Sequence, residues 1–359
     1  MKQSTTNLIT RICLMISAIA LLLTFVHDLA LANSKVIDTP VSLVSTTQSP
    51  QPDEVSDPNT ASAQTLSRPI LSAAALGAAV GASGYAQALQ ARAWLDPVPE
   101  IAYPEEIQYT VTKPISLIKQ STLWGVSPRL LLALNPGFSE GSQLSPGLKL
   151  TVFKRTAWSP QPVSIGPTNR GRIQNGRMMP EGDENSGHFL RDERQRSFAT
   201  ANTINALVSG FAAYATRFPE APRVNVGDFS KRRGGKIKPH ASHQSGRDVD
   251  IGFIHVGTPR NPQHFTRATS TNVDVEKTWF MLKSIIASGE VKSIYVDKTV
   301  QKQLYNFAKN ELNDAQLEAI FSIPKREHSS SALIQHWPGH RNHFHIRFTC
   351  PENNPRCRK

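Results

Sequence analysis

The sequence predicts an α+β protein in which a small βααβ module precedes a larger domain, whose central and mainly antiparallel sheet is flanked by helices. Its 359 residues exceed the size of one typical domain, so two folded units are expected. Helix-like and strand-like runs in the C-terminal half lack the regular alternation of parallel α/β sheets, which favours an α+β fold. Between residues 107 and 153, a strand, two helices and a second strand are predicted in close succession.

The N-terminus has the pattern of a secretory signal. Lys2 and Arg11 precede an uncharged apolar run at 12–26, and small residues lead to a cleavage site after Ala32. This run is shorter than the about 20 residues that a membrane-spanning helix needs. We therefore predict a cleaved signal peptide over residues 1–32 and a location in the periplasm.

Residues 33–104 are rich in Ser, Thr, Pro, Gln and Ala and are predicted to form a disordered, low-complexity tether, because they cannot bury enough apolar surface to fold alone. Within them, the uncharged stretch 70–89 is interpreted as a surface helix or disorder rather than a second membrane segment. The whole chain carries a net charge of +12. In an exported protein this charge favours peptidoglycan, with its free peptide carboxylates, over nucleic acid as the partner.

The βααβ module is predicted from short patterns. Tyr109–Val111 and Leu148–Val152 have strand character, Ser116–Leu123 has helical spacing, and Ser127 is a candidate N-cap for a second helix. The stretches WGVSPRLLLALNPG and LSPGLKLTVF resemble a LysM peptidoglycan-binding domain, which residues 105–156 would form. The resemblance implies glycan contact, but KPISL replaces the usual Gly-Asp-Thr-Leu start, so a structural spacer is the alternative.

The larger domain is predicted over residues 161–359. Apolar residues at helical spacing predict helices at 198–218 and 278–287. Four strands are predicted at 223–226, 249–254, 293–296 and 343–348.

Histidines cluster in two stretches of this domain. PHASHQSGRDVDIGF contains His240 and His243, and HWPGHRNHFHIRF contains His340, His343 and His345. Residues two apart in a strand point to the same face, so the last two imidazoles are expected side by side.

Asp248 and Asp250 share a strand face in the same way. Adjacent buried faces of His and Asp are costly without an ion to neutralise and organise them. Zinc suits this donor set, because a catalytic site takes three such ligands and a water whose pKa falls to about 7. Spacing does not choose between the two aspartates, and a surface pair of histidines or an aspartate capping a turn is the alternative interpretation of either motif alone.

From Ser164 to Cys357 the chain resembles the penicillin-insensitive murein endopeptidases, a family related to D-alanyl-D-alanine carboxypeptidases and dipeptidases. The matching stretches are SIGPTNRGRI, VGDFSKRRGGKIKPHASHQSGRDVDIGF and WPGHRNHFHIRFTCP. The resemblance implies that His243, Asp250 and His345 bind Zn²⁺.

The same resemblance makes His343 the general base and places His340 beside it as a second catalytic candidate. His240 would line the site and is an additional candidate metal ligand. Arg247, which stands where an apolar residue is expected, and Lys238 are candidate substrate-binding residues that would hold a carboxylate.

Cys350 and Cys357 are expected to form a local disulfide in an oxidising compartment. The function implied is an exported zinc endopeptidase that hydrolyses D-alanyl–meso-diaminopimelate cross-links in peptidoglycan by means of a metal-activated water. One alternative is a D,D- or L,D-carboxypeptidase of the same group. Another is a non-catalytic wall-binding protein with a structural zinc. A nucleic-acid binder is the weakest reading, because the signal sequence directs the chain out of the cytoplasm.

Overall fold

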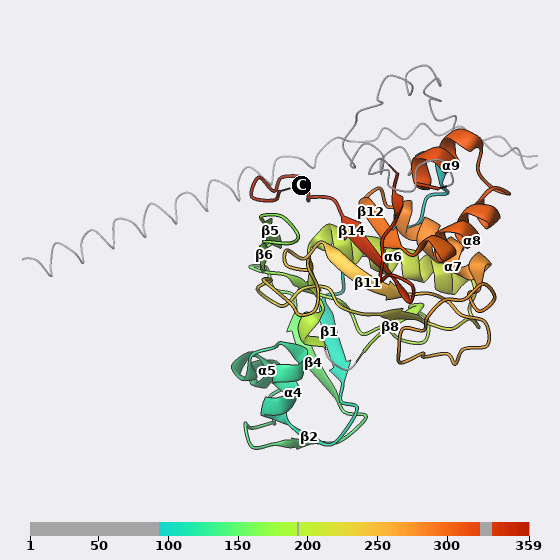
Figure 1. Cartoon of the computed structure of the whole chain (residues 1–359). Coiled ribbons are helices and arrows are strands. Elements are labelled where there is room, and N and C mark those ends of the chain that lie inside the picture. Colours follow the sequence, from blue (N-terminus) through green and yellow to red (C-terminus); the bar gives the residue numbers. More distant parts are fainter. Residues whose placement is uncertain (1–92, 192–193, 324–331, 359) are drawn as a thin grey trace, which may run out of the picture. The chain divides into compact units, whose positions relative to one another are not determined.

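The computed structural model describes residues 93–191, 194–323 and 332–358 (Figure 1), all of which belong to one compact unit, Leu71–Lys359. The predictions for the signal peptide, for residues 70–89 and for most of the tether lie outside the described residues. No helix within the described ranges is both long enough and apolar enough to cross a membrane.

The strand, two helices and strand predicted for the small module are present in that order, together with two further two-residue strands that were not predicted. The elements of the module are β1 (Glu106–Thr110), β2 (Ile115–Ser116), α4 (Leu117–Trp124), α5 (Pro128–Leu134), β3 (Gln143–Leu144) and β4 (Lys149–Lys154). Strands β1 and β4 pair antiparallel. Helix α4 ends at Gly125, whose φ of 67° lies in the left-handed region that favours glycine, and Ser127 caps α5 by accepting a hydrogen bond from the amide of Leu130.

The larger domain is built on a six-stranded sheet with the order β13-β12-β14-β11-β10-β8. These strands are β8 (His188–Leu190), β10 (Val224–Val226), β11 (Asp248–Gly252), β12 (Val291–Val296), β13 (Ile334–His336) and β14 (His343–Phe348). The three central pairings are antiparallel and the two outer ones are parallel. The α+β class is confirmed, and the sheet is mixed, with the expected antiparallel pairing at its centre.

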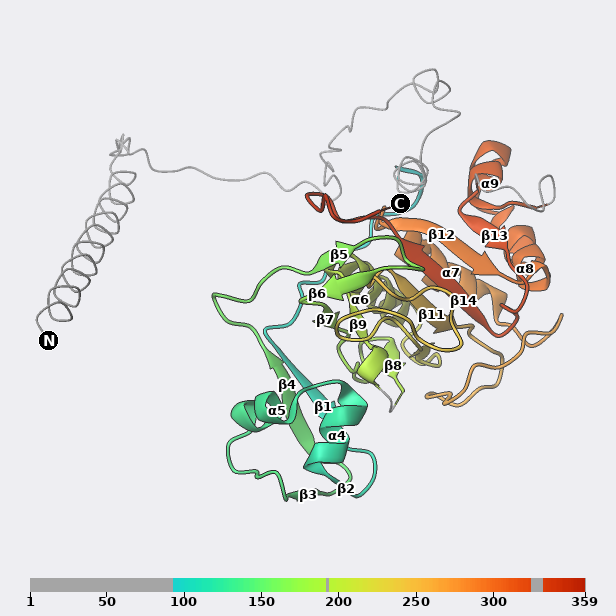
Figure 2. The ribbon, with the colours of Figure 1, turned by 60° about the vertical axis from the view of Figure 1, so that its left-hand side comes forward.

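Helices cover the sheet. They are α6 (Ala201–Arg217), α7 (Val275–Ile286), α8 (Lys298–Ala308) and α9 (Asp314–Ile320). Helices α6 and α7 lie side by side behind the sheet (Figure 2). Their close approach requires Gly210, because an added Cβ there would lie 2.6 Å from the side chain of Ile285. Trp279, Leu207 and Phe344 are fully buried in the resulting core.

Short elements connect the module to the sheet. They are β5 (Val163–Ile165), β6 (Arg172–Gln174), β7 (Arg177–Met178), a 3-10 turn η1 (Arg194–Arg196) and β9 (Phe198–Ala199). The last part of the predicted tether, residues 93–104, also packs against the domain. The amide of Ile101 donates to Ser209 Oγ over 2.8 Å, and the hydroxyl of the buried Tyr103 donates to the carbonyl oxygen of Met178. These residues are therefore part of the folded structure rather than of a free tether.

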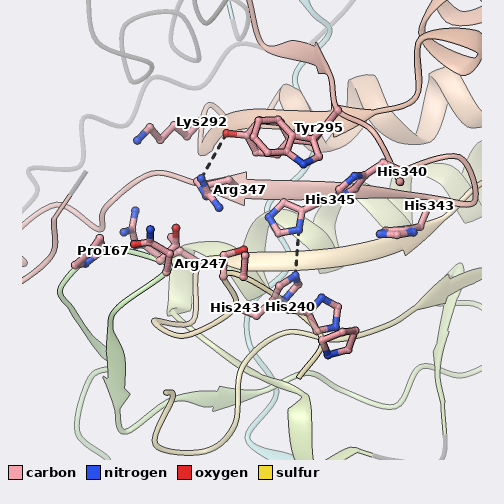
Figure 3. Close-up of a pocket in the computed structure, with 17 residues that line it drawn as sticks. Pro167, His240, His243, Arg247, Lys292, Tyr295, His340, His343, His345 and Arg347 are labelled. Atoms are coloured by element: carbon pink, nitrogen blue, oxygen red, sulfur yellow. Dashed lines mark hydrogen bonds between the residues drawn. The ribbon is translucent and has the colours of Figure 1, made fainter. Parts of the chain in front are cut away.

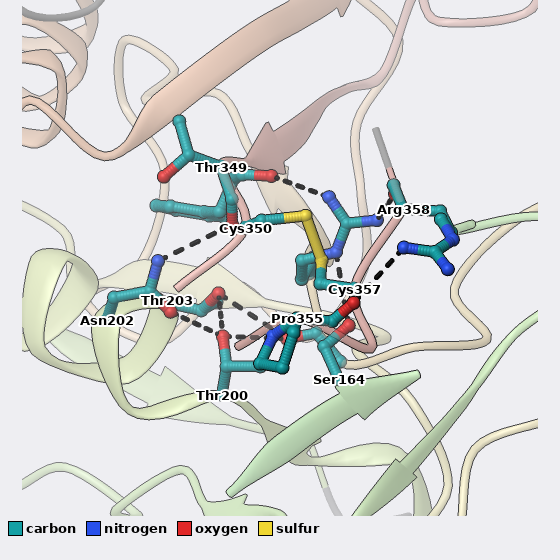
Figure 4. The surroundings of a disulfide bond; sticks show 12 residues. Ser164, Thr200, Asn202, Thr203, Thr349, Cys350, Pro355, Cys357 and Arg358 are labelled. Atoms are coloured by element: carbon teal, nitrogen blue, oxygen red, sulfur yellow. Dashed lines mark hydrogen bonds between the residues drawn. A yellow bond between two sulfur atoms is a disulfide. The ribbon is translucent and has the colours of Figure 1, made fainter. Parts of the chain in front are cut away.

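The disulfide expected between Cys350 and Cys357 is confirmed and closes the C-terminal tail into a loop (Figure 4). The tail lies against Ser164, at the start of the peptidase domain. The backbone amide of Gly166 donates to the carbonyl oxygen of Arg356 over 2.9 Å. The two ends of the larger domain are thus joined directly.

Candidate metal centre

The register of two central strands brings the predicted site residues together. In the antiparallel pair of β11 and β14, Asp250 lies opposite His345, and Asp248 lies opposite Arg347. Val249 and Ile251, which alternate with the aspartates, are fully buried in the hydrophobic core. The alternation therefore sends apolar side chains into the core and polar side chains to the opposite face, as the sequence predicts.

His243 lies in the loop before β11, in a left-handed backbone conformation with φ of 65°. Its Nδ1 is 2.9 Å from the carbonyl oxygen of Phe229, which can only accept a hydrogen bond. The proton is therefore on Nδ1, and Nε2 presents a lone pair. The backbone amide of His243 donates to Asp248 Oδ2 over 2.9 Å, which fixes the loop to the strand.

Three potential ligand atoms lie at the corners of a triangle, which we call the ligand triangle. His243 Nε2 is 3.1 Å from His345 Nδ1, and each of these nitrogens is 3.2 Å from Asp250 Oδ1. A tetrahedral zinc with bonds of about 2.0–2.1 Å separates its ligands by about 3.3 Å. Asp250 Oδ1 is buried and makes no hydrogen bond to any described residue. Figure 3 shows the two imidazoles pointing toward each other. This donor set fits a divalent metal ion.

His240 lies at the edge of this triangle. Its Nδ1 is 3.6 Å from Asp250 Oδ2, and the ligand atoms of His240, His243 and Asp250 lie within 4.8 Å of one another. Its Nε2 is 2.9 Å from Asp228 Oδ2, which also accepts a hydrogen bond from Arg196 Nη1. Asp228 therefore orients the His240 ring, a role that the sequence motif alone does not reveal.

Asp248 lies behind the triangle rather than in it. Its Oδ1 is 3.3 Å from His345 Nε2 and accepts a hydrogen bond from Arg347 Nε over 2.8 Å. Burial would raise the pKa of Asp248, but Arg347 and His345 hold it well below its usual value. A carboxylate on the far nitrogen of a ligand histidine fixes the ring and makes it more basic. The fold thus distinguishes the two aspartates, which their spacing in the sequence does not: Asp250 is a corner of the triangle, and Asp248 contacts the outer nitrogen of His345.

The carboxylates and imidazoles of the centre shift one another's pKa values toward their charged forms. Burial would raise the pKa of Asp250, but His243 and His345 keep it well below its usual value. Burial likewise disfavours the charged form of His345, yet Asp248 and Asp250 raise its pKa to about 9. A metal ion on this nitrogen would replace the proton that the two carboxylates now favour.

His343 is adjacent to the triangle, and its pKa is shifted in the opposite direction from that of His345. Its Nε2 is 3.7 Å from Asp250 Oδ1, and its Nδ1 is 2.7 Å from Asn342 Oδ1. Burial lowers its pKa to about 4 despite the opposing charge of Asp250, so the ring is neutral at neutral pH. Phe265 stacks on the ring at 5.2 Å. With Nδ1 donating to Asn342, Nε2 can accept a proton, as a general base must.

His240, His243, His343 and His345 line a pocket of about 810 Å³. His340 also lines it, with its ring 4.9 Å from that of His343. Tyr295 (Figure 3) and Trp337 also line the pocket, with their rings 5.5 Å apart, and Trp337 is 55% exposed. Sequence reasoning missed this aromatic wall, although Trp337 lies in the same HWPGH stretch as the histidines.

The two candidate substrate-binding residues lie in different surroundings. Lys238 is exposed, next to Pro239, which lines the pocket. Arg247 borders the pocket but is only 1% exposed. Its guanidinium donates to the carbonyl oxygens of Arg358 and Phe348 and to a serine hydroxyl. The structure thus gives Arg247 a role in holding the C-terminal tail, and its contact with substrate stays a prediction.

Replacing Arg247 by Met is expected to lower the free energy of unfolding by about 2–4 kcal/mol, because the buried carbonyl oxygen of Phe348 and the part-buried one of Arg358 lose a donor. Urea denaturation followed by circular dichroism measures this change. Arg170→Met is the control, because Arg170 is exposed. A raised KM with an unchanged denaturation midpoint would instead assign Arg247 to substrate binding alone.

Known proteins are similar to the part of the chain that carries these residues. The model of the family described as penicillin-insensitive murein endopeptidase matches residues 164–359. A protein of that name from Pectobacterium atrosepticum is 24% identical over 235 residues, covering 59% of this chain and 76% of the relative. One from Yersinia enterocolitica is 26% identical over 223 residues, or 57% and 75% of the two chains. One from Haemophilus influenzae is 26% identical over 209 residues, or 54% and 65%.

Proposed function

This chain belongs to the penicillin-insensitive murein endopeptidase family, whose members are peptidases that hydrolyse peptidoglycan, and we propose that it is an exported zinc metallo-endopeptidase that cleaves D-alanyl–meso-diaminopimelate cross-links. The observation that carries the proposal is the triangle of His243 Nε2, Asp250 Oδ1 and His345 Nδ1, with sides of 3.1–3.2 Å. The neutral His343 lies at its side, in the pocket that a peptide would enter.

His243, Asp250 and His345 would hold the zinc ion, and His240 lies within reach as a further ligand. When bound, such an ion polarises the scissile carbonyl group and lowers the pKa of a water molecule. His343 accepts the proton of the attacking water at Nε2 and returns it to the leaving amine. Asn342 holds the other ring nitrogen throughout, so the accepting lone pair stays directed into the pocket.

The remaining wall positions the peptide. Tyr295 and Trp337 offer ring faces against which a stem peptide packs, with ring centroids 5.5 Å apart. Lys238 and Lys292 add positive charge near the pocket, which suits a substrate rich in carboxylates. These contacts orient the bond to be cut; the acid–base chemistry belongs to His343.

The mature chain is expected to convert cross-linked muropeptide dimers in isolated sacculi into monomers. A chelator should abolish this conversion, because the ligand triangle then lacks its cation, and added Zn²⁺ should restore it. Mass spectrometry of the released fragments measures the products. Monomers that lose one D-alanine while dimers persist would instead indicate a carboxypeptidase. Metal-loaded protein that releases nothing would indicate a wall-binding protein with a structural zinc.

A further inference from the structure

A second hollow, of about 1230 Å³, lies where the βααβ module meets the peptidase domain. We call it the junction groove. One wall comes from the turn between α4 and α5 and from the end of β4, and the other comes from β6, β7 and the loop before His240. It shares no lining residue with the pocket at the metal centre. The groove is lined by five arginines and by no aspartate or glutamate of the described chain: Arg155, Arg172, Arg177, Arg232 and Arg233.

The two walls of the junction groove are held in a fixed relation. The hydroxyl of the fully buried Tyr109, in β1, donates to the carbonyl oxygen of Met179 over 2.7 Å. The amide of Thr110 donates to Glu181 Oε2 over 2.8 Å. A Cβ added to Gly125 would lie 3.1 Å from the backbone of the peptidase domain, so the module and the domain touch directly at the groove. The groove is therefore a built feature and not a gap between units joined by a linker.

Three of the arginines have charges that the protein does not compensate. Arg172, Arg232 and Arg233 are exposed, and their guanidinium groups make no ion pair or hydrogen bond with any described residue. They are also neighbours, because the amide of Ile173 donates to the carbonyl oxygen of Arg233 over 3.3 Å. By contrast, Arg155 pairs with Glu105 over 2.9 Å. Neighbouring like charges repel, so an anionic ligand across them would be favourable.

The arginines of the junction groove favour a polymer that carries repeated carboxylates. A guanidinium group binds a carboxylate through two parallel hydrogen bonds, and a row of such groups suits a polymer that repeats its carboxylates. Single-stranded nucleic acid would also need exposed rings for base stacking, whereas Tyr103 and Phe198 in the lining are buried, and Phe153 is half-buried with its ring in contact with that of Tyr103. Leu130, 37% exposed, adds apolar surface for the rest of a peptide.

We propose that the junction groove is a second peptidoglycan-binding site, which holds the free carboxylates of a stem peptide away from the metal centre and keeps the enzyme on the wall. This proposal rests on the proposed substrate, because peptidoglycan is the carboxylate-rich polymer on which the metal centre would act. It differs from a glycan contact by the module alone, because most of the charge comes from the peptidase domain.

The test compares sacculus binding by the full mature chain with that of a variant carrying Arg172→Glu, Arg232→Glu and Arg233→Glu. Cosedimentation with isolated sacculi is expected to show affinity at least about tenfold weaker and a flatter dependence on salt. Cleavage of a small soluble cross-linked muropeptide dimer should stay within about twofold of wild type, since the groove is separate from the catalytic pocket. Wild-type failure to cleave the dimer would refute the proposed function while leaving the binding comparison valid.

The matched control carries Arg217→Glu, Lys302→Glu and Lys309→Glu, three exposed residues of the peptidase domain that lie outside the groove. It changes net charge equally and should bind sacculi as wild type does. Sacculi with chemically amidated carboxylates should bind wild type as weakly as the groove variant binds untreated sacculi. Equal loss in the control, full binding to amidated sacculi, or displacement by duplex DNA at comparable charge would each overturn the proposal. If the glutamate variant melts early, the Arg→Gln triple variant takes its place.

Discussion

His343→Ala is expected to slow hydrolysis of cross-linked muropeptides by about 10²–10⁴-fold while the protein keeps its bound metal. The ring lies beside the ligand triangle, with Nε2 3.7 Å from Asp250 Oδ1, and its low pKa of about 4 keeps it available to accept a proton. Removing it takes away the base without removing a corner of the triangle. The rate is measured by chromatography of the released monomers, and the metal content by elemental analysis of the same preparation.

The matched control for this variant is His264→Ala. His264 is exposed and does not line the catalytic pocket, so both rate and metal content should be unchanged. Loss of metal together with activity in His343→Ala would show that His343 is a ligand. Retention of the full rate would show that the proton is carried by another group, of which the neighbouring His340 is the first to examine.

Asp250→Ala is expected to abolish both metal binding and hydrolysis. Its Oδ1 is the only oxygen corner of the triangle, 3.2 Å from each of the two imidazole nitrogens, so its loss leaves two imidazoles and no negatively charged ligand in the triangle. Elemental analysis after dialysis, together with the rate of dimer cleavage, measures the effect. Stoichiometric metal at wild-type affinity in this variant would exclude the proposed ligand set.

Asp248→Asn provides a graded comparison for that result. Asp248 contacts His345 on the nitrogen that faces away from the triangle, so its neutralisation should weaken metal binding by about 10–100-fold without abolishing it. Full loss of metal in Asp248→Asn, with retention in Asp250→Ala, would exchange the roles of the two aspartates.

The strands that carry the centre were predictable because they are buried and regular. The bounds of β14, His343–Phe348, agree with the predicted strand, and β11 begins one residue before its predicted start. Their mutual register was not predictable, since it depends on pairing between segments about a hundred residues apart in the chain. Spacing did not separate Asp250 from Asp248; the family resemblance favoured Asp250, and the register shows the different positions of the two side chains.

Other elements were missed for identifiable reasons. Helix α9 spans only seven residues, which is too short for a clear periodic signal. Helix α8 is less apolar overall, but its buried residues Val300, Leu304 and Ala308 recur at helical spacing, so the sequence did contain the pattern of an amphipathic helix. Their caps were visible: Asp297 caps α8, and Asn313 forms a capping box with Gln316. The three-residue strands β8 and β13 are too short for alternation to identify them.

The environment of Arg247 lay beyond sequence reasoning altogether. An arginine between two candidate ligands suggests substrate recognition, but its partners are Ser164, Phe348 and Arg358. All three partners are more than eighty positions away from Arg247 in the sequence, so no local sequence pattern predicts these contacts. The contact between Asp228 and His240 was also not predictable, although they are only 12 positions apart, because it depends on the conformation of the loop between them.

The central position of β14 has a consequence for how the enzyme is made. This strand follows β11 and β12 in the chain, yet it lies between them in the sheet and supplies both His343 and His345. Until β14 is in place, the sheet lacks the strand at its middle, and the metal centre lacks both of these imidazoles. The middle of the sheet and the metal centre therefore form in the same step, when β14 inserts between the two strands that precede it.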